Sequence, residues 1–433
     1  MSKSLFTTKN DNNMFIVLTI LIFVLVSDTM ISQVSDLLAP QLVSDFSIAL
    51  FYVFVAIFGI TQYLVLQYTK RKISYQYVKS SSTRLMYKIV TVVQYSLSAI
   101  VLMLVIQIVL TSSYSSYILV ALTIISYSLS VGLMVYFAKK FLSWYLSNRQ
   151  SIIVLLYAIS FALIAITSSI AVAMDLNNFA SKPTVIYPTS TVEFPSNVEG
   201  TPNFVLSIAY HYLDLFSFVF VWGATVLLLH EYVRTWRLRH WILVCIPLVY
   251  FLSTFIDYAG LYNPSSDAEW LNYYVYASLN STAGGVFFGF AFLVVARNIH
   301  NEIVKGCMAI TAFGFVLLFI SNQVTLVASS FPPFGAVTIS YFGLSSYLIV
   351  VGLYTSALSV SQDAFLRKSI KKSVIDKSLL GYIGTAEMQI EIEKWVRILD
   401  RTDNKTNVSP SMNEDDIKLY IQDVVSEVRK KMG

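Results

Sequence analysis

The sequence predicts an all-α integral membrane protein with about ten transmembrane helices and both termini in the cytoplasm. Ten apolar stretches are each long enough to cross a hydrocarbon core of roughly 30 Å, which takes about 20 helical residues. If these stretches alternate in direction, all of the 30 Lys and Arg residues except Lys182 lie on the side of the N-terminus. Such sorting is typical of chains inserted under the positive-inside rule. Hydrophobic residues make up 56% of the chain and charged residues only 13%, which argues against a soluble domain.

The predicted spans form a membrane bundle over residues 1–362, followed by a charged cytoplasmic tail over 363–433. The spans are 14–34, 46–68, 87–111, 116–138, 151–174, 204–230, 241–262, 273–297, 304–329 and 335–360. Connections after the second, fourth, sixth and eighth spans carry the basic residues, for example Lys70-Arg71-Lys72, and are therefore expected in the cytoplasm. The opposite connections are mostly short, acidic or neutral. They are 35–45, 112–115, 175–203, 263–272 and 330–334.

Two elements of this topology have alternative interpretations. The first span could be a cleaved signal peptide, but its 21 apolar-rich residues exceed a signal core and contain no small-residue cleavage site, so we expect it to be retained. The loop 175–203 is either an ordered cap over the bundle or a flexible connector. It also divides the spans into five plus five, although the halves share no sequence similarity that would indicate an inverted repeat.

The tail is predicted to contain two amphipathic helices. Ser411 and Glu414 form a capping box that opens a helix over 411–431. Its apolar stripe comprises Ile417, Ile421, Val424, Val425 and Val428. A second stripe comprises Met388, Ile392, Trp395, Val396 and Leu399. The two helices could pack together as a local hairpin, or the region 385–431 could dock a cytoplasmic or membrane protein partner. We expect the stripe 417–428 to lie against protein, since an exposed stripe of that size invites association.

The exit from the last span resembles a known group of proteins. It reads Ser359-Val360-Ser361-Gln362-Asp363, then Leu366-Arg367-Lys368-Ser369-Ile370, and continues into Ile383-Gly384-Thr385-Ala386-Glu387-Met388. This pattern is similar to the C-terminal part of uncharacterised multi-pass membrane proteins from ammonia-oxidising archaea. The resemblance covers about a sixth of the chain and implies an archaeal plasma membrane. It implies no activity, because the group has none assigned.

Polar residues at membrane depth mark the candidate ligand pocket. Ionisable groups inside a span cost at least about 2–3 kcal/mol at the helix centre, so each needs a partner or a wet cavity. The candidates are Asp28, His211, Asp214, Asp257, Asn280, Asn322 and Gln323, all in the outer part of their spans. His211 and Asp214 share one helix face with Ser207 and Phe218. These residues either line an outward-facing pocket or satisfy one another as interhelical contacts.

The sequence argues against an enzyme. An intramembrane aspartyl protease would need two carboxylates at one depth and a Gly-x-Gly-Asp pattern, whereas Asp257 follows Phe255-Ile256. Retinal and haem chemistry would need a buried Lys or paired axial His, and His230-Glu231 lacks the second His of a zincin helix. We therefore expect no catalytic residues, no cofactor and no metal. Without a concentrated basic face, we also expect no nucleic-acid partner.

Three functional interpretations remain. The first is a sensor-like, receptor-like or partner-coupled protein of the plasma membrane, with an outward polar pocket and a tail that reports to a partner. The second is a secondary transporter, and the third is an accessory structural subunit of a membrane complex. Transporters usually break helices near the membrane midplane with Gly or Pro. In the predicted spans only Pro247 and the glycines Gly284, Gly285 and Gly289 offer such a break.

Overall fold

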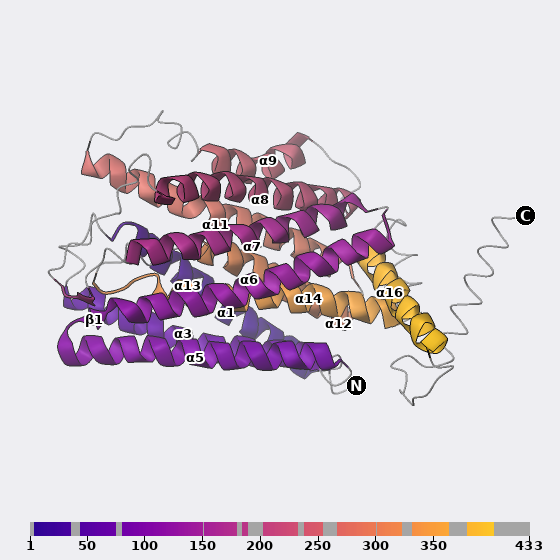
Figure 1. The fold of residues 1–433 in the computed structure, drawn as a ribbon, viewed down its shortest axis with the longest axis horizontal. Helices are drawn as coiled ribbons and strands as arrows, with labels where there is room; N and C mark the ends of the chain where they lie inside the picture. The colour runs from indigo at the N-terminus through magenta and orange to yellow at the C-terminus, as the bar shows by residue number, and fades with distance from the viewer. Residues whose placement is uncertain are drawn as a thin grey trace, which may run out of the picture.

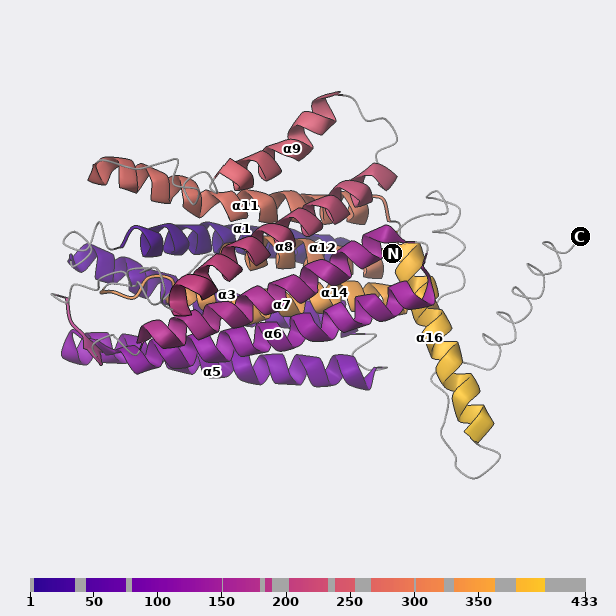
Figure 2. The ribbon, with the colours of Figure 1, turned by 45° about the horizontal axis from the view of Figure 1, so that its top comes forward.

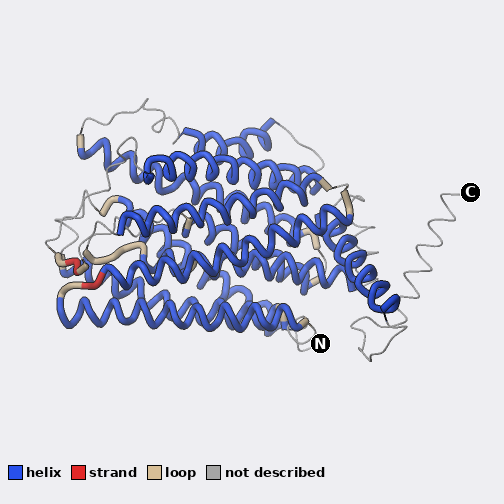
Figure 3. Tube along the Cα trace, in the orientation of Figure 1, coloured by secondary structure: helices blue, strands red, loops and turns tan. Residues whose placement is uncertain are grey.

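The computed structural model describes most of the bundle and the first half of the tail. The described ranges are 4–35, 44–74, 80–149, 151–179, 184–188, 202–232, 238–253, 266–299, 301–322, 331–362 and 379–401. The helices pack side by side as an elongated bundle (Figures 1 and 3). In the described ranges, nine helical segments are long and apolar enough to cross a membrane, which confirms an all-α, multi-pass membrane protein.

These segments match nine of the ten predicted spans. They are α1 (Ser4–Gln33), α3 (Asp45–Lys72), α5 (Ser81–Thr111), α6 (Ser116–Ser147), α7 (Ile152–Phe179), α8 (Pro202–Tyr232), α11 (Asp267–Arg297), α12 (Glu302–Ser321) and the pair α13 (Ala336–Ser340) and α14 (Phe342–Gln362). The predicted span 241–262 corresponds to the shorter apolar helix α9 (Leu238–Ser253). Residues 254–265, and with them the second half of that prediction, lie outside the described ranges. Helix α9 contacts α8 and α11 and is tilted away from the bundle (Figure 2).

The two ends of the bundle differ. We call one the basic end, because it holds the basic residues 70–72 of α3 together with Lys139 and Lys140 of α6. Helix α1 also begins at this end (Figure 1). We call the other the strand end. There β1 (Tyr114–Ser115) pairs antiparallel with β2 (Val185–Ile186). The described part of the loop 175–203 therefore includes a short strand that lies against the bundle.

Helix α14 runs through the middle of the bundle. Every residue in its most apolar 18-residue window is buried, which holds for none of the other membrane-spanning segments in the described ranges. It packs most extensively on α12, which in turn packs on α11. A Cβ atom on Gly289 of α11 would lie 2.7 Å from the backbone oxygen of Ala312, and one on Gly285 would lie 2.8 Å from the Cβ of Phe319. These glycines permit close helix packing. These glycines do not interrupt the helix, since α11 is continuous from Asp267 to Arg297.

The first tail helix, α16 (Leu379–Arg401), packs against the basic end of the bundle and then extends away from it (Figures 1 and 2). Its first half contributes Leu379, Leu380, Ile383 and Ala386 to the hydrophobic core, and Met388 is buried as well. This half contacts α14, α6 and α7. The side chains of Trp395, Val396 and Leu399 and the predicted helix 411–431 lie outside what the structure describes.

Candidate functional site

The last membrane segment contains an irregular stretch at the strand end. Residues 331–341 are all buried, although only 336–340 of them are helical. The Phe331–Pro332 peptide bond is cis, and Gly335 has a φ of 92°, a left-handed conformation that favours glycine. The Phe334 ring packs edge-on against Phe51 and Phe54 of α3. Irregular backbone at membrane depth is tolerated only where protein surrounds it, and that condition is met here.

Asp28 of α1 binds this stretch directly. Its Oδ1 accepts a hydrogen bond from the backbone N–H of Gly335 at 2.9 Å. Its Oδ2 accepts from the backbone N–H and the hydroxyl of Thr338 at 2.9 and 2.7 Å. The carboxyl group therefore satisfies two N–H groups at the start of α13, which a helix leaves without intrahelical partners. Asp28 is fully buried, and it caps the first turn of α13 although it lies far from that helix in the sequence.

Side chains of α3, α5 and α6 bond the turn at Tyr341 that separates α13 from α14. Ser126 donates to the carbonyl of Ile339 at 2.5 Å, and Gln94 donates to the carbonyl of Ser340 at 3.2 Å. The Tyr341 hydroxyl lies 2.5 Å from that of Thr61. These contacts satisfy backbone groups that an uninterrupted helix would pair internally. The break between α13 and α14 is thus held by hydrogen bonds from α3, α5 and α6. We call this set of hydrogen-bonded side chains and the break the bonded layer.

Two glutamine side chains complete the layer. The amide nitrogen of Gln62 donates to the Ser98 hydroxyl at 2.6 Å and to the backbone oxygen of Gln94 at 3.3 Å. The side-chain oxygens of Gln62 and Gln94 are both buried and make no hydrogen bond within the described part of the chain. The layer is therefore polar as well as buried.

The predicted pocket residues that the structure describes lie on α1, α8, α11 and α12. One group of three is on α1, α11 and α12. Asn280 of α11 is buried, and its side-chain oxygen accepts from the backbone N–H of Ser281. Asn322 is the C-cap of α12 and is partly buried. A bond of 2.5 Å between Ser278 and Gln33 ties α11 to α1. Asp28 belongs to this group by its position on α1.

The other two, His211 and Asp214, are on α8, which packs on α6's neighbour α7 and on α11. His211 Nδ1 is 2.7 Å from the backbone oxygen of Ser207 one turn away. Asp214 is partly buried on the same face of α8. Tyr210 lies close enough to Asp214, Asp175 and Tyr127 to interact with them electrostatically. We call Tyr127, Asp175, Tyr210, His211 and Asp214 the acid–tyrosine cluster. Asp257 and Gln323 lie outside the described ranges.

The acid–tyrosine cluster touches the bonded layer through Tyr127. The Tyr127 ring packs against Phe342, the first residue of α14, with ring centroids 4.7 Å apart. Its neighbour Ser126 makes the hydrogen bond to Ile339. Helix α6 therefore contacts both sides of the break, and the cluster and the break are linked by one pair of consecutive residues.

At the strand end, a pair of aromatic residues covers the irregular stretch. Tyr114 of β1 stacks on Phe331 at 6.2 Å with an interplanar angle of 17°. Burial raises the pKa of the Tyr114 hydroxyl well above its ordinary value, so the group stays neutral at any physiological pH. The pair covers the irregular stretch 331–335 with apolar surface.

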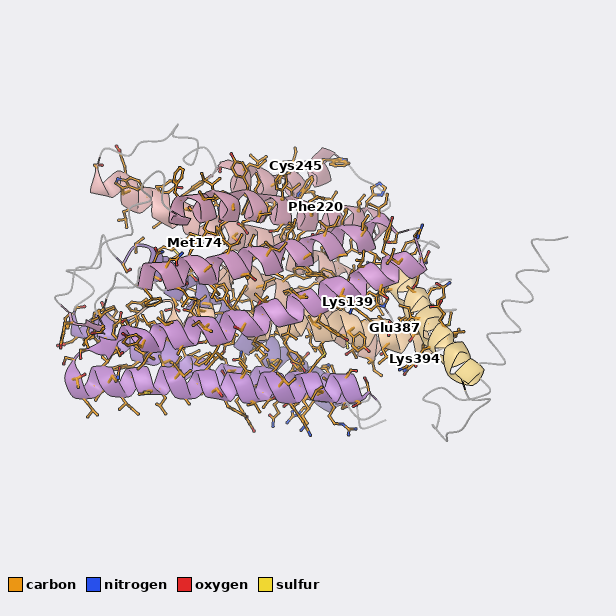
Figure 4. The ribbon with its side chains drawn as sticks, viewed as in Figure 1. Lys139, Met174, Phe220, Cys245, Glu387 and Lys394 are labelled. Atoms are coloured by element: carbon orange, nitrogen blue, oxygen red, sulfur yellow. The ribbon has the colours of Figure 1, made fainter. Side chains whose placement is uncertain are left out.

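At the basic end, Glu387 of α16 is held by two residues of α6. Its carboxylate lies 2.8 Å from Lys140 Nζ and accepts a hydrogen bond of 2.7 Å from the indole N–H of Trp144. Figure 4 labels Glu387 near the start of α16. Lys140 Nζ also lies 5.5 Å from the ring centroid of Tyr354 on α14. One cation therefore connects α6, α14 and α16.

Several of these residues escape sequence reasoning. Asp175 falls one residue beyond the predicted fifth span and so reads as part of a loop. Gln62 and Gln94 are single amides in apolar runs, which is a usable signal for a buried polar contact. The contacts of Thr338 and Glu387 cannot be recognised in the sequence, because their partners Asp28 and Lys140 are 310 and 247 positions away.

Comparisons with known proteins give no assignment. No family model, no curated protein and no solved structure matches this chain. Among the described residues, no group of three or more His, Cys, Asp or Glu side chains could hold a metal ion.

Proposed function

We propose that this multi-pass membrane protein is sensor-like: it couples an event at the strand end to the tail helix α16 through the central helix α14. The observation that carries this proposal is that α14 is surrounded by protein and is held at both ends. Asp28 and Ser126 hold the segment that leads into it. At its other end α14 packs on α16, where Val360 lies against Gly384.

The proposed orientation puts the basic end in the cytoplasm of a plasma membrane. Charge sorting supports this, because Lys182 alone among 30 basic residues belongs to a connection of the opposite side. The strand end then faces outward, and α16 is available to a cytoplasmic or membrane partner. Both chain termini are cytoplasmic in this arrangement.

The proposed receiving site is the acid–tyrosine cluster. In this proposal, a ligand or proton that changes the charge at Asp214 or Asp175 alters the polar contacts around Tyr210 and Tyr127, which lie near these carboxyl groups. Tyr127 contacts Phe342, so a small shift of α6 displaces the start of α14. A packed helix has few intermediate positions, which favours a switch between two arrangements over gradual bending.

Hydrogen exchange in the intact protein tests this coupling. We expect Asp214→Asn to change exchange of the amides 379–390 of α16 by about 2- to 30-fold, which corresponds to a coupling of about 0.5–2 kcal/mol. Tyr212→Phe is the matched control, because Tyr212 is 54% exposed on the same helix. If Asp214→Asn alters exchange only within α8 and leaves 379–390 unchanged, the sensor proposal fails.

A transporter is the second candidate. The interruption between α13 and α14 favours it, since transporters often bind substrates at discontinuous helices. The side-chain oxygens of Gln62 and Gln94, which make no hydrogen bond among the described residues, lie near this break. A cysteine at Ser126 distinguishes the two functions: a transporter would expose it to reagents from both sides in turn, and a sensor from neither or from outside only. An accessory subunit would instead co-purify with a stable complex from native membrane.

A further inference from the structure

An apolar groove follows α7 on the surface of the bundle and has a volume of about 430 Å³. Its walls include Val135 and Ala138 of α6, Ala162, Ala165 and Ala173 of α7, and Leu206 of α8. All three helices are membrane-spanning segments. In a membrane the groove therefore opens to hydrocarbon, and its occupant must be apolar.

The dimensions of the groove select among apolar occupants. Ala162 and Ala173 are eleven residues apart, which corresponds to roughly 16 Å along a helix. A helix of that length with a diameter of roughly 10 Å would need roughly 1,200 Å³, about three times the volume present. A single hydrocarbon tail is narrow enough to fit, so the shape favours a lipid over a partner helix.

A cation lies at one end of the groove. Lys139 follows Val135 by four residues, so the two share a face of α6. Lys139 is exposed and makes no ion pair or hydrogen bond in the part of the chain that the structure describes, whereas its neighbour Lys140 binds Glu387. Figure 4 labels Lys139 on α6.

The depth of Lys139 suits a lipid headgroup. Helix α6 has 32 residues and is roughly 48 Å long, so each end extends roughly 9 Å beyond a hydrocarbon core of roughly 30 Å. Lys139 is eight residues from the last residue, Ser147, or roughly 12 Å. Its Cα is thus just inside the core boundary, and its long side chain reaches the interface.

We propose that this groove binds a phosphate-bearing membrane lipid, with one tail along α7 and the phosphate on Lys139. The site is distinct from the acid–tyrosine cluster and does not depend on the proposed sensor function. The lipid fills the space between α6, α7 and α8 and contributes to their packing.

Native mass spectrometry of the intact protein, purified in mild detergent, tests this proposal. The unmodified protein should retain one phosphate-bearing lipid. Lys139→Gln should reduce the retained fraction about fivefold, because one basic residue near an anionic headgroup contributes about 1 kcal/mol. Ala162→Phe should fill the groove and abolish retention, with Ala173→Phe as a second variant should Ala162→Phe not fold.

The matched controls are Lys88→Gln and Ala99→Phe on α5, where both residues are exposed away from the groove. These variants should retain the lipid at the unmodified level. A lipid-free unmodified protein would overturn the proposal. Equal retention in the groove variants and the controls would overturn it as well.

Discussion

Lys140 of α6 and Glu387 of α16 form an ion pair of 2.8 Å, although 247 positions separate them in the sequence. Their side chains are only 19% and 9% exposed, so the pair is largely removed from water. The indole of Trp144 shares the same carboxylate. This contact joins the first half of the tail helix to α6.

Removing the cation should release α16 from the bundle. Lys140→Met leaves the Glu387 carboxylate buried without its charge partner, which costs about 3 kcal/mol. Amides 379–390 should then exchange roughly 100-fold faster. The double variant Lys140→Met with Glu387→Met should recover part of the protection. Glu302→Gln is the control, because its pair with Lys305 is long, at 3.5 Å, and exposed. Unchanged exchange in Lys140→Met would show that the ion pair does not hold α16.

Asp28→Asn should destabilise the strand end of the bundle. The carboxylate accepts three hydrogen bonds from Gly335 and Thr338, whereas an amide offers one acceptor oxygen and turns its NH₂ toward a donor. We expect a loss of about 2–3 kcal/mol of stability, measured by thermal unfolding in detergent. Thr338→Val removes one of these bonds and should cost about 1 kcal/mol. An Asp28→Asn protein as stable as the unmodified one would contradict this role.

Gly289→Ala should separate α11 from α12. The new Cβ would lie 2.7 Å from the Ala312 backbone oxygen, so the helices must move apart at a cost of about 1–3 kcal/mol. Gly132→Ala on α6 is the matched control, since no atom lies within 4 Å of its added Cβ. That substitution should be neutral or stabilise the helix by up to about 1 kcal/mol. Equal unfolding temperatures for the two variants would refute the close approach.

Cysteine labelling tests the orientation. In a background that lacks Cys245 and Cys307, a cysteine at Ser190 should react with an impermeant maleimide in intact cells. A cysteine at Ser373 should react only after the cells are opened. This outcome is expected because basic residues remain on the cytoplasmic side during insertion. Reaction of both positions from outside would contradict the topology.

The sequence predicts the helices well and their polar contacts poorly, for a physical reason. A membrane-spanning helix can be recognised from a local stretch of the sequence, because it needs about 20 consecutive apolar residues. A buried polar contact depends on a partner that the chain brings from far away, as Thr338 does for Asp28. The interrupted last segment is an intermediate case. Pro332, Pro333 and Gly335 mark a turn, but only the structure places that turn inside the protein.

The predicted pocket residues illustrate the same limit. Helical spacing puts His211 and Asp214 on one face of α8, because that relationship is local. Depth along each span puts Asp28 at a similar outer level, but depth carries no information on which helices are neighbours. In the structure, Asp28 accepts hydrogen bonds from Thr338 of α13 and from Gly335, the N-cap residue of α13.

The burial of α14 has a consequence for how the protein is made. Ribosomes deliver the N-terminal helices to the membrane first, and α14 emerges after the other membrane-spanning helices of the described ranges. Among the described membrane-spanning helices, the one made last is also the one that its neighbours surround, so the earlier helices cannot reach their final packing until α14 is made. A chain cut short before residue 336 would lose its centre and not its edge. Premature stops between α12 and α14 should therefore be as damaging as early ones.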